Sequence, residues 1–509
     1  MSAVLQTGAR AWPTSDVYAS RGYRRAIVGF VLTLAFAGAY AAVIVATGGD
    51  MLALAPVVGA LVVLMIGAHP VTGVYLLFGA ALLFEQFAIA GLAPLTAQSH
   101  LFQNVSAYTP LPIRLSLAEL LMLLTGASLV FHRLTGRRVA LRMGPFGWAI
   151  VAYGAAFALG GLIGFARGGV DLEAALNEVR APIELCALYF LAANLIEDRR
   201  QLMVIVWMFV ALVGVKALQG IGNYQEGPAW TPYDAGSVTS HEDIVFFDAA
   251  IALAIAMVAL RARTRFGYFL LGLQPVILVA LLLDQRRTAF IAIAAVFAVI
   301  TLLTFFVRRR RALVLAGVAA VGLAAYGALF WDSSGPIAEP VRAVRAVVEP
   351  SSSSTRDQSS NAWRVIENRN IAYTVRQLPL TGVGLGQEYL FQQQPPPLYG
   401  LTYWRNITHN ALLWLWLKAG PFAALALWFL VARAVLVSSA LFVREQRDGE
   451  LRWLAAFPLA IVICQVIFSS VDQGMTFSRS MIVLGTALGI CAFLVRSASL
   501  ESASVEQVR

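Results

Sequence analysis

Long apolar runs alternate with short polar segments along the whole chain, and most of these runs are long enough to cross a membrane. About 20 residues in a helix span the hydrocarbon core of a bilayer, and a helix satisfies its own backbone groups there. The pattern therefore predicts an all-α, polytopic integral membrane protein, a bundle of about 12–14 transmembrane helices. The predicted spans are 26–46, 52–68, 71–91, 115–132, 146–166, 181–197, 202–221, 244–260, 266–283, 288–306, 312–331, 421–441, 452–470 and 480–495.

Arginines in the short polar loops predict the orientation of these spans. Cytoplasmic loops are enriched in Lys and Arg. If the N-terminus is cytoplasmic, nearly every loop on that side after the third span is basic. These loops and the C-terminal tail contain Arg133, Arg137, Arg138, Arg142, Arg199, Arg200, Arg261, Arg263, Arg265, Arg308 to Arg311, Arg444, Arg447, Arg452 and Arg496. We therefore predict that both termini are cytoplasmic.

Three regions follow from this topology. Residues 1–331 hold the first eleven spans, and residues 332–408 form a large extracytoplasmic loop. We expect this loop to be partly helical, with an amphipathic helix from Asn361 to Gln377. Residues 409–509 hold an interfacial or re-entrant helix, the last three spans and a cytoplasmic tail. A break at Gly420-Pro421 is expected, because an unbroken helix over 410–441 would be roughly 48 Å long.

Composition excludes several other classes of protein. The chain is 59% hydrophobic and 13% charged, whereas a soluble domain is about 25% charged. The formal charge of +10 comes from arginines in short loops, which favours membrane topology over nucleic-acid binding. Cys186, Cys464 and Cys491 lie in apolar segments, as small buried hydrophobic residues do. The chain has no phosphate-binding glycine loop and no HExxH motif, so we expect neither a cofactor nor a metal.

Two arginines lie at a predicted outer membrane boundary, in the segment Asp284-Gln285-Arg286-Arg287. They either snorkel to lipid headgroups or pair with Asp284, or they bind an anion. Arginine forms forked hydrogen bonds to phosphate oxygens, and charges near membrane depth often mark a substrate path. The segment is therefore a candidate phosphate site, and the sequence leaves open whether Arg286 or Arg287 is the ligand.

Other outer arginines are further candidates. Arg180 precedes the sixth span and either pairs with Glu184, one helical turn later, or binds a ligand. The large outer loop contributes Arg364, Arg369, Arg376 and Arg405. Most arginines in such loops are simply solvated.

Two histidines lie where polar outer segments enter the membrane. His409-Asn410 opens an aromatic, apolar helix. A histidine is often structural, but it is also the usual general base near neutral pH, and Asn410 is a candidate helix cap. His241, followed by Glu242 and Asp243, opens another span on the outer side.

Several of these residues together resemble the O-antigen ligase and polymerase superfamily. The matching residues are Trp363-Arg364, the stretch Leu378-Pro379-Leu380-Thr381-Gly382-Val383-Gly384-Leu385-Gly386, His409-Asn410, Gly420 and Arg287-Thr288-Ala289. In that family a P-x-x-G-x-G-x-G stretch lies in a large outer loop, and a His-Asn pair begins the next helix. This sequence has Gln-Arg-Arg where the family commonly has Ser-Arg.

The resemblance implies a GT-C-like glycosyltransferase of the bacterial cytoplasmic (inner) membrane, independent of metal. Such enzymes take a glycan of lipopolysaccharide or exopolysaccharide type from an undecaprenyl-pyrophosphate donor on the outer face. They transfer it to a lipid or glycan acceptor, or polymerise it. His409 and Arg287 are the implied catalytic residues. The implied substrate-binding residues are Arg180, Arg286, Arg364, Arg405 and Asn410.

Two other classes of function remain open. A transporter or flippase of lipid-linked sugars also has many spans, but such proteins often show inverted repeats and charges at the midplane. A structural partner in an envelope-assembly complex needs no chemistry of its own. Within the enzyme class, ligase, polymerase and protein glycosylation differ only in the acceptor.

Overall fold

The computed structural model describes a helical protein. It covers residues 55–84, 101–107, 109, 111–136, 141–226, 238–333, 335–349, 355–397, 403–444 and 449–506, with isolated positions 38, 41, 42 and 45. Over these residues there is no strand, only an isolated bridge between Asn104 and Ser116. The predicted all-α fold is confirmed.

The helices follow the apolar pattern of the sequence. In chain order they are α2 (Ala55–Ala68), α3 (Val71–Leu83), η2 (Val105–Ala107), α5 (Leu117–Leu134), α6 (Gly147–Arg167), α7 (Leu172–Leu195), α8 (Arg199–Glu226), α9 (Asp243–Leu260), α10 (Arg265–Leu283), α11 (Arg287–Phe330), η4 (Pro336–Ala338), α12 (Glu339–Val348), α13 (Thr355–Gln377), α14 (Ala411–Val443), α15 (Gly449–Leu454), α16 (Ala456–Ser469) and α17 (Ser478–Glu506).

Nine helices in the described part of the chain are long and apolar enough to cross a membrane. One of them, α11, has 44 residues and is kinked at Arg308, whose φ of −146° and ψ of 67° are not helical. Its two halves correspond to the predicted spans 288–306 and 312–331. The predicted polytopic membrane protein is confirmed. Most of the first predicted span, 26–46, lies outside the described residues.

The chain divides into two units, Met1–Ala68 and His69–Arg509. The only helix described in the first unit is α2. In the second unit, α7 packs along α17, α6 along α14, and α9 along both α11 and α16. Glycine permits the closest of these approaches, since a Cβ atom on Gly489 would lie 2.3 Å from the Cβ atom of Ala192. Small residues have this role between membrane helices.

The glycine-rich segment 382–386 is a tight loop that joins three helices. The backbone N–H of Val383 donates to Leu417 on α14 (2.7 Å), and that of Leu385 donates to Gly160 on α6 (3.1 Å). Gly384 has a φ of 93°, and a Cβ atom there would lie 2.3 Å from the backbone nitrogen of Gly164. These contacts hold the segment close against both helices.

A buried ion pair holds the same loop. Nζ of Lys418 on α14 lies 2.7 Å from a carboxylate oxygen of Glu178 on α7, and neither side chain is exposed. The Glu178 carboxylate also accepts from the backbone N–H of Gly386 (2.6 Å), and Lys418 donates to the carbonyl of Gln387. Both charges therefore have partners, as buried charges require.

The helix break expected near the start of α14 is present. Gly420 lies inside α14 with a φ of 73° and a ψ of −174°, followed by Pro421. Asn410 caps the helix, since its side chain accepts from the backbone N–H of Leu413 (3.0 Å).

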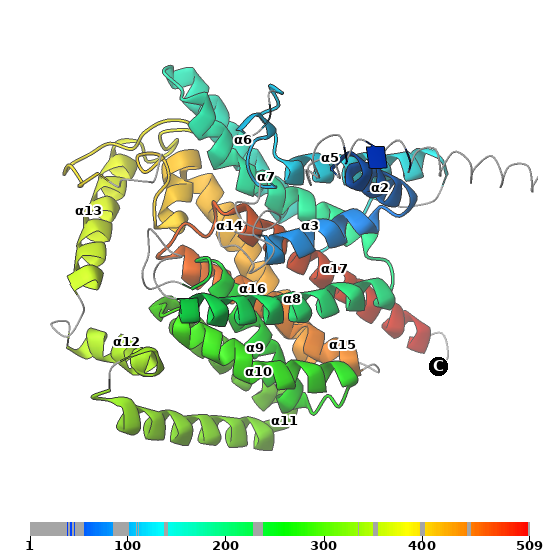
Figure 1. Ribbon diagram of the computed structural model, residues 1–509, viewed down its shortest axis with the longest axis vertical. Coiled ribbons are helices and arrows are strands. Elements are labelled where there is room, and N and C mark those ends of the chain that lie inside the picture. The colour runs from blue at the N-terminus through cyan, green and yellow to red at the C-terminus, as the bar shows by residue number, and fades with distance from the viewer. Residues whose placement is uncertain are drawn as a thin grey trace, which may run out of the picture. The chain divides into compact units, whose positions relative to one another are not determined.

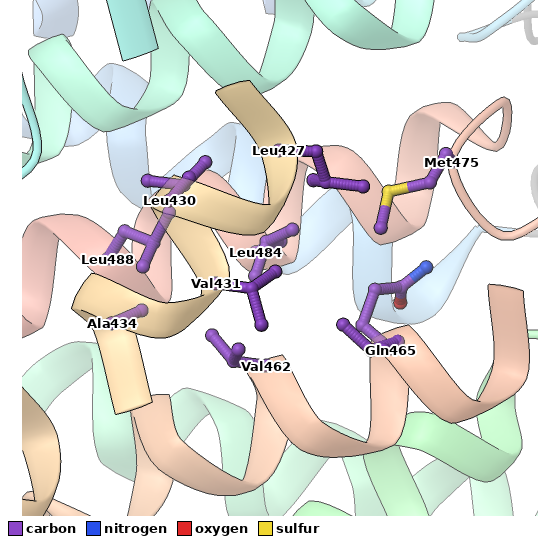
Figure 2. Close-up of a pocket in the computed structure, with 10 residues that line it drawn as sticks. Leu427, Leu430, Val431, Ala434, Val462, Gln465, Met475, Leu484 and Leu488 are labelled. Carbon is purple, nitrogen blue, oxygen red and sulfur yellow. The ribbon is translucent and has the colours of Figure 1, made fainter. Parts of the chain in front are cut away.

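Figure 2 shows a small gap between α14, α16 and α17. Its volume is about 10 Å³, roughly the size of one water. Leu427, Leu430 and Leu484 line it together with Gln465. The Nε2 atom of Gln465 donates to the Ser469 hydroxyl and to the Gly474 carbonyl. The gap is a packing detail, because it is far too small for a substrate.

Candidate functional site

A polar cavity of about 650 Å³ opens where several helix ends meet. Its walls come from the segment before α9, the α10–α11 junction, α12, α13, the segment before α14 and the α16–α17 loop. In Figure 1, α12 lies between α13 and the nearer end of α11. The lining residues are His241, Ile244, Asp284, Gln285, Arg286, Arg287, Thr288, Ser333, Glu339, Arg342, Arg345, Ala346, Ser360, Asn361, Arg364, His409, Phe468, Val471 and Asp472.

The cavity carries an excess of positive charge. Five arginines and three carboxylates line it, a formal charge of +2 with both histidines neutral. The Nε atom of Arg287 lies 3.8 Å from Oε1 of Glu339, and the Nε atom of Arg286 lies 3.7 Å from Oδ2 of Asp284. Asp284 is fully buried, and burial raises its pKa although Arg286 and two backbone N–H groups oppose this. Such a site favours an anion.

Arg364 differs from the other cavity arginines. The structure shows ion pairs for Arg286, Arg287, Arg342 and Arg345. For Arg364 it shows none over the described residues, and its buried Nε atom has no hydrogen-bond partner there. A ligand anion would supply that partner.

His409 lies in the cavity wall beside a buried carboxylate. Its Nδ1 atom is 3.3 Å from Glu367 Oε1, and its backbone N–H donates to Glu367 Oε2 at 3.1 Å. The Trp363 ring packs edge-on against the imidazole, with ring centroids 5.2 Å apart. Glu367 is fully buried, so it fixes both the position and the tautomer of His409.

A second histidine–carboxylate pair lines the same cavity. His241 Nδ1 lies 3.0 Å from Asp472 Oδ2. Burial by itself would raise the pKa of Asp472. The hydrogen bond and charge of His241, the charge of Arg286 and the N–H of Gln473 outweigh burial and lower that pKa. Asp472 is therefore an ionised partner for His241.

Three of the predicted site residues lie outside the cavity wall. Arg180 pairs with Glu119 (3.1 Å) rather than with Glu184. Arg405 pairs with Glu388 (3.3 Å) and lies over the rings of Trp404 and Phe391. Asn410 is the helix cap described above. The cavity brings together Arg286, Arg287, Arg364 and His409.

Some residues of the site were not singled out from the sequence. Glu367, the buried partner of His409, lies three positions after Arg364 on the amphipathic helix predicted there, and this spacing puts both on one face. Arg342 and Arg345 have the same spacing on α12, which could have marked them. For metals, no group of three or more His, Cys, Asp or Glu in the described ranges has the arrangement of a binding site.

An apolar cavity of about 560 Å³ adjoins the polar one. The two share Arg287, Ala346 and Asn361. Helix α12 contributes to both, since Arg342 and Arg345 line the polar cavity while Ala343, Val344 and Val348 line the apolar one. Phe290, Ile291 and Ala294 of α11 form the opposite wall.

Comparison with known proteins connects this region to a family. The family model described as O-antigen ligase matches residues 275–429. This stretch contains α11, α12, α13 and the kink of α14, and with them most of the polar cavity's wall. A search of curated proteins finds no match. The predicted resemblance to the O-antigen ligase superfamily is confirmed over residues 275–429 of this polytopic membrane protein.

Proposed function

We propose that the protein is a membrane glycosyltransferase that moves a glycan from an undecaprenyl-pyrophosphate donor to an acceptor hydroxyl. The reaction takes place on the outer face of the bacterial cytoplasmic membrane. The acceptor is a lipid, or a further glycan if the enzyme is a polymerase. The similarity of residues 275–429 to the O-antigen ligase family supports a glycosyltransferase-like enzyme.

The observation that carries this proposal is the composition of the polar cavity. It joins an excess of arginine to a histidine held by a buried carboxylate. A pyrophosphate that bridges a lipid and a sugar carries about two negative charges, which match the formal charge of the cavity. Arg287 and Arg364, with Arg286, are the proposed pyrophosphate ligands.

The proposed chemistry is displacement at the anomeric carbon. The acceptor oxygen forms a bond to this carbon as the bond to the pyrophosphate oxygen breaks. Charge develops on the leaving pyrophosphate, where fixed guanidinium groups stabilise the transition state. His409 takes the acceptor proton as general base, and Glu367 stabilises the imidazolium that forms.

The apolar cavity supports a lipid carrier. A donor whose pyrophosphate occupies the polar cavity has its hydrocarbon chain next to Arg287, where the apolar cavity begins. Burial of a hydrocarbon chain stabilises binding by about 0.8 kcal/mol per CH₂ group. A free sugar nucleotide would not use this second cavity.

Reconstitution in lipid vesicles tests the proposal. The purified protein is given an undecaprenyl-pyrophosphate glycan and candidate acceptors, with chelator present, and pyrophosphate-lipid release and glycan product size are followed. We expect release that resists chelator and falls by about 100-fold or more in His409→Ala. A matched control is His132→Ala, which removes a histidine on α5, away from the cavity.

Product size then separates the two reaction types. A single new species indicates a ligase, and a ladder of products indicates a polymerase. Donor binding without release, whatever the acceptor, would contradict the enzyme proposal. The next measurement would then be a flipping assay, which tests a transporter of lipid-linked sugars.

A further inference from the structure

The proposed mechanism uses one histidine of the cavity, and His241 has no role in it. His241 is about one-third exposed at its side chain, and Asp472 is buried beneath it. The two residues are 231 positions apart in the sequence, so the fold brings them together at the cavity wall. Because Nδ1 faces Asp472, a ligand in the cavity would meet Nε2.

The charged groups around this pair are those of the proposed pyrophosphate site. Asp472 interacts with Arg286, and Asp284 interacts with both Arg286 and His241. Glu242 and Asp243 follow His241 in the chain, but Arg479 of α17 binds both, at 2.9 Å and 2.6 Å. His241 therefore lies on the side of the cavity that carries Arg286. His409 lies at the side formed by α13, where Glu367 binds it.

We propose that His241 is the proton donor to the departing pyrophosphate and that Asp472 is its positioning residue. The inference rests on the proposed function. The bond from the anomeric carbon to the pyrophosphate oxygen breaks, and the electron pair stays on that oxygen. His409 accepts the proton of the acceptor hydroxyl, and the imidazolium of His241 gives a proton to the pyrophosphate oxygen.

This assignment balances the reaction. One proton leaves the acceptor and one reaches the pyrophosphate, and both imidazoles return to their starting states by exchange with water. The ionised Asp472 stabilises the imidazolium form of His241, as a buried aspartate does beside a catalytic histidine. A phosphate oxygen with a second ionisation near pH 6 is a suitable proton acceptor near neutral pH.

The test is the pH dependence of kcat/KM for the lipid-linked donor in vesicles. Wild type, His241→Gln, Asp472→Asn and the control His132→Gln are compared from mildly acidic to alkaline pH. We expect a bell-shaped profile for wild type and for the control. His241→Gln should lower the rate by about 100-fold at neutral pH and abolish the alkaline limb, because the group that must be protonated is absent.

Asp472→Asn supplies a readout that a purely structural role would not change. Without the carboxylate the imidazolium is less stable, so the alkaline limb should move to lower pH while the acidic limb stays in place. An unchanged profile in both variants, or a change in KM alone, would overturn the inference and leave the proposed function intact. No transfer by wild type would instead remove the proposed function.

Discussion

At the scale of single residues, the cavity depends on which charges are already satisfied by the protein. Asp284, Glu339 and Glu349 neutralise part of the charge of neighbouring arginines. Arg364 receives no such partner from the described residues, and its Nε atom is buried. The binding free energy of an anion in the cavity should therefore depend more on Arg364 than on the other arginines.

Substitution of Arg364 tests this expectation. Arg364→Gln removes the charge, and we expect kcat/KM for the lipid-linked donor to fall by about 100-fold. Arg364→Lys keeps the charge but cannot form the paired hydrogen bonds of a guanidinium group, so it should retain only part of the wild-type activity. The control is Arg369→Gln, on an exposed position of the same helix. Equal effects at positions 364 and 369 would contradict a ligand role.

At the scale of elements, the glycine-rich segment 382–386 and helix α12 have different structural roles. The loop 382–386 contacts α6, α7 and α14 but does not line the polar cavity. It anchors the end of α13, which carries Glu367, and the start of α14, which begins two residues after His409. Helix α12 lines both cavities and forms the boundary between them.

A pair of glycine variants isolates the packing of the loop. Gly384 and Gly335 have nearly the same φ, 93° and 95°, but only Gly384 has backbone within contact distance of an added Cβ atom. Gly335→Ala should cost about 1–2 kcal/mol, from its positive φ. Gly384→Ala should cost about 1–3 kcal/mol more, from overpacking. Thermal unfolding in detergent measures both, and equal losses would show that packing has no part.

The chain-length preference of the enzyme tests the role of α12. Val344 lines the apolar cavity, so Val344→Asp should lower kcat/KM for a donor with a long polyprenyl chain by about 10–100-fold. A donor with a short chain should lose much less. Leu390→Asp, at another exposed apolar position, is the control. A uniform loss with both donors would argue against a hydrocarbon site here.

At the scale of the whole molecule, α7, the glycine loop and α14 form one connected support. The buried pair of Glu178 and Lys418 joins them. Removing one partner of a buried pair leaves an uncompensated charge, which costs more than the pair contributes.

Lys418→Met should therefore destabilise the protein by about 3–5 kcal/mol. Adding Glu178→Gln to it should recover much of that loss, because no buried charge then remains. The thermal unfolding temperatures of the single and double variants measure this difference. A double variant less stable than Lys418→Met alone would contradict the explanation.

The sequence alone determined the helical class, the position of most spans and the break in α14. Each is a local property: a bilayer requires about 20 apolar residues per helix, and Gly420-Pro421 interrupts a helix wherever it lies. The family motifs were also local enough to be recognised. The order of these elements, however, does not say which side chains meet.

Only the tertiary structure decided the composition of the site. It pairs Arg180 with Glu119, 61 positions away, rather than with Glu184 one helical turn later. It also joins His409 to Glu367 and His241 to Asp472. The physical reason is that burial selects partners for charged groups by proximity in space, and proximity depends on how the helices pack. Spacing along one helix could indicate candidates, but only the packing of several helices made them one cavity.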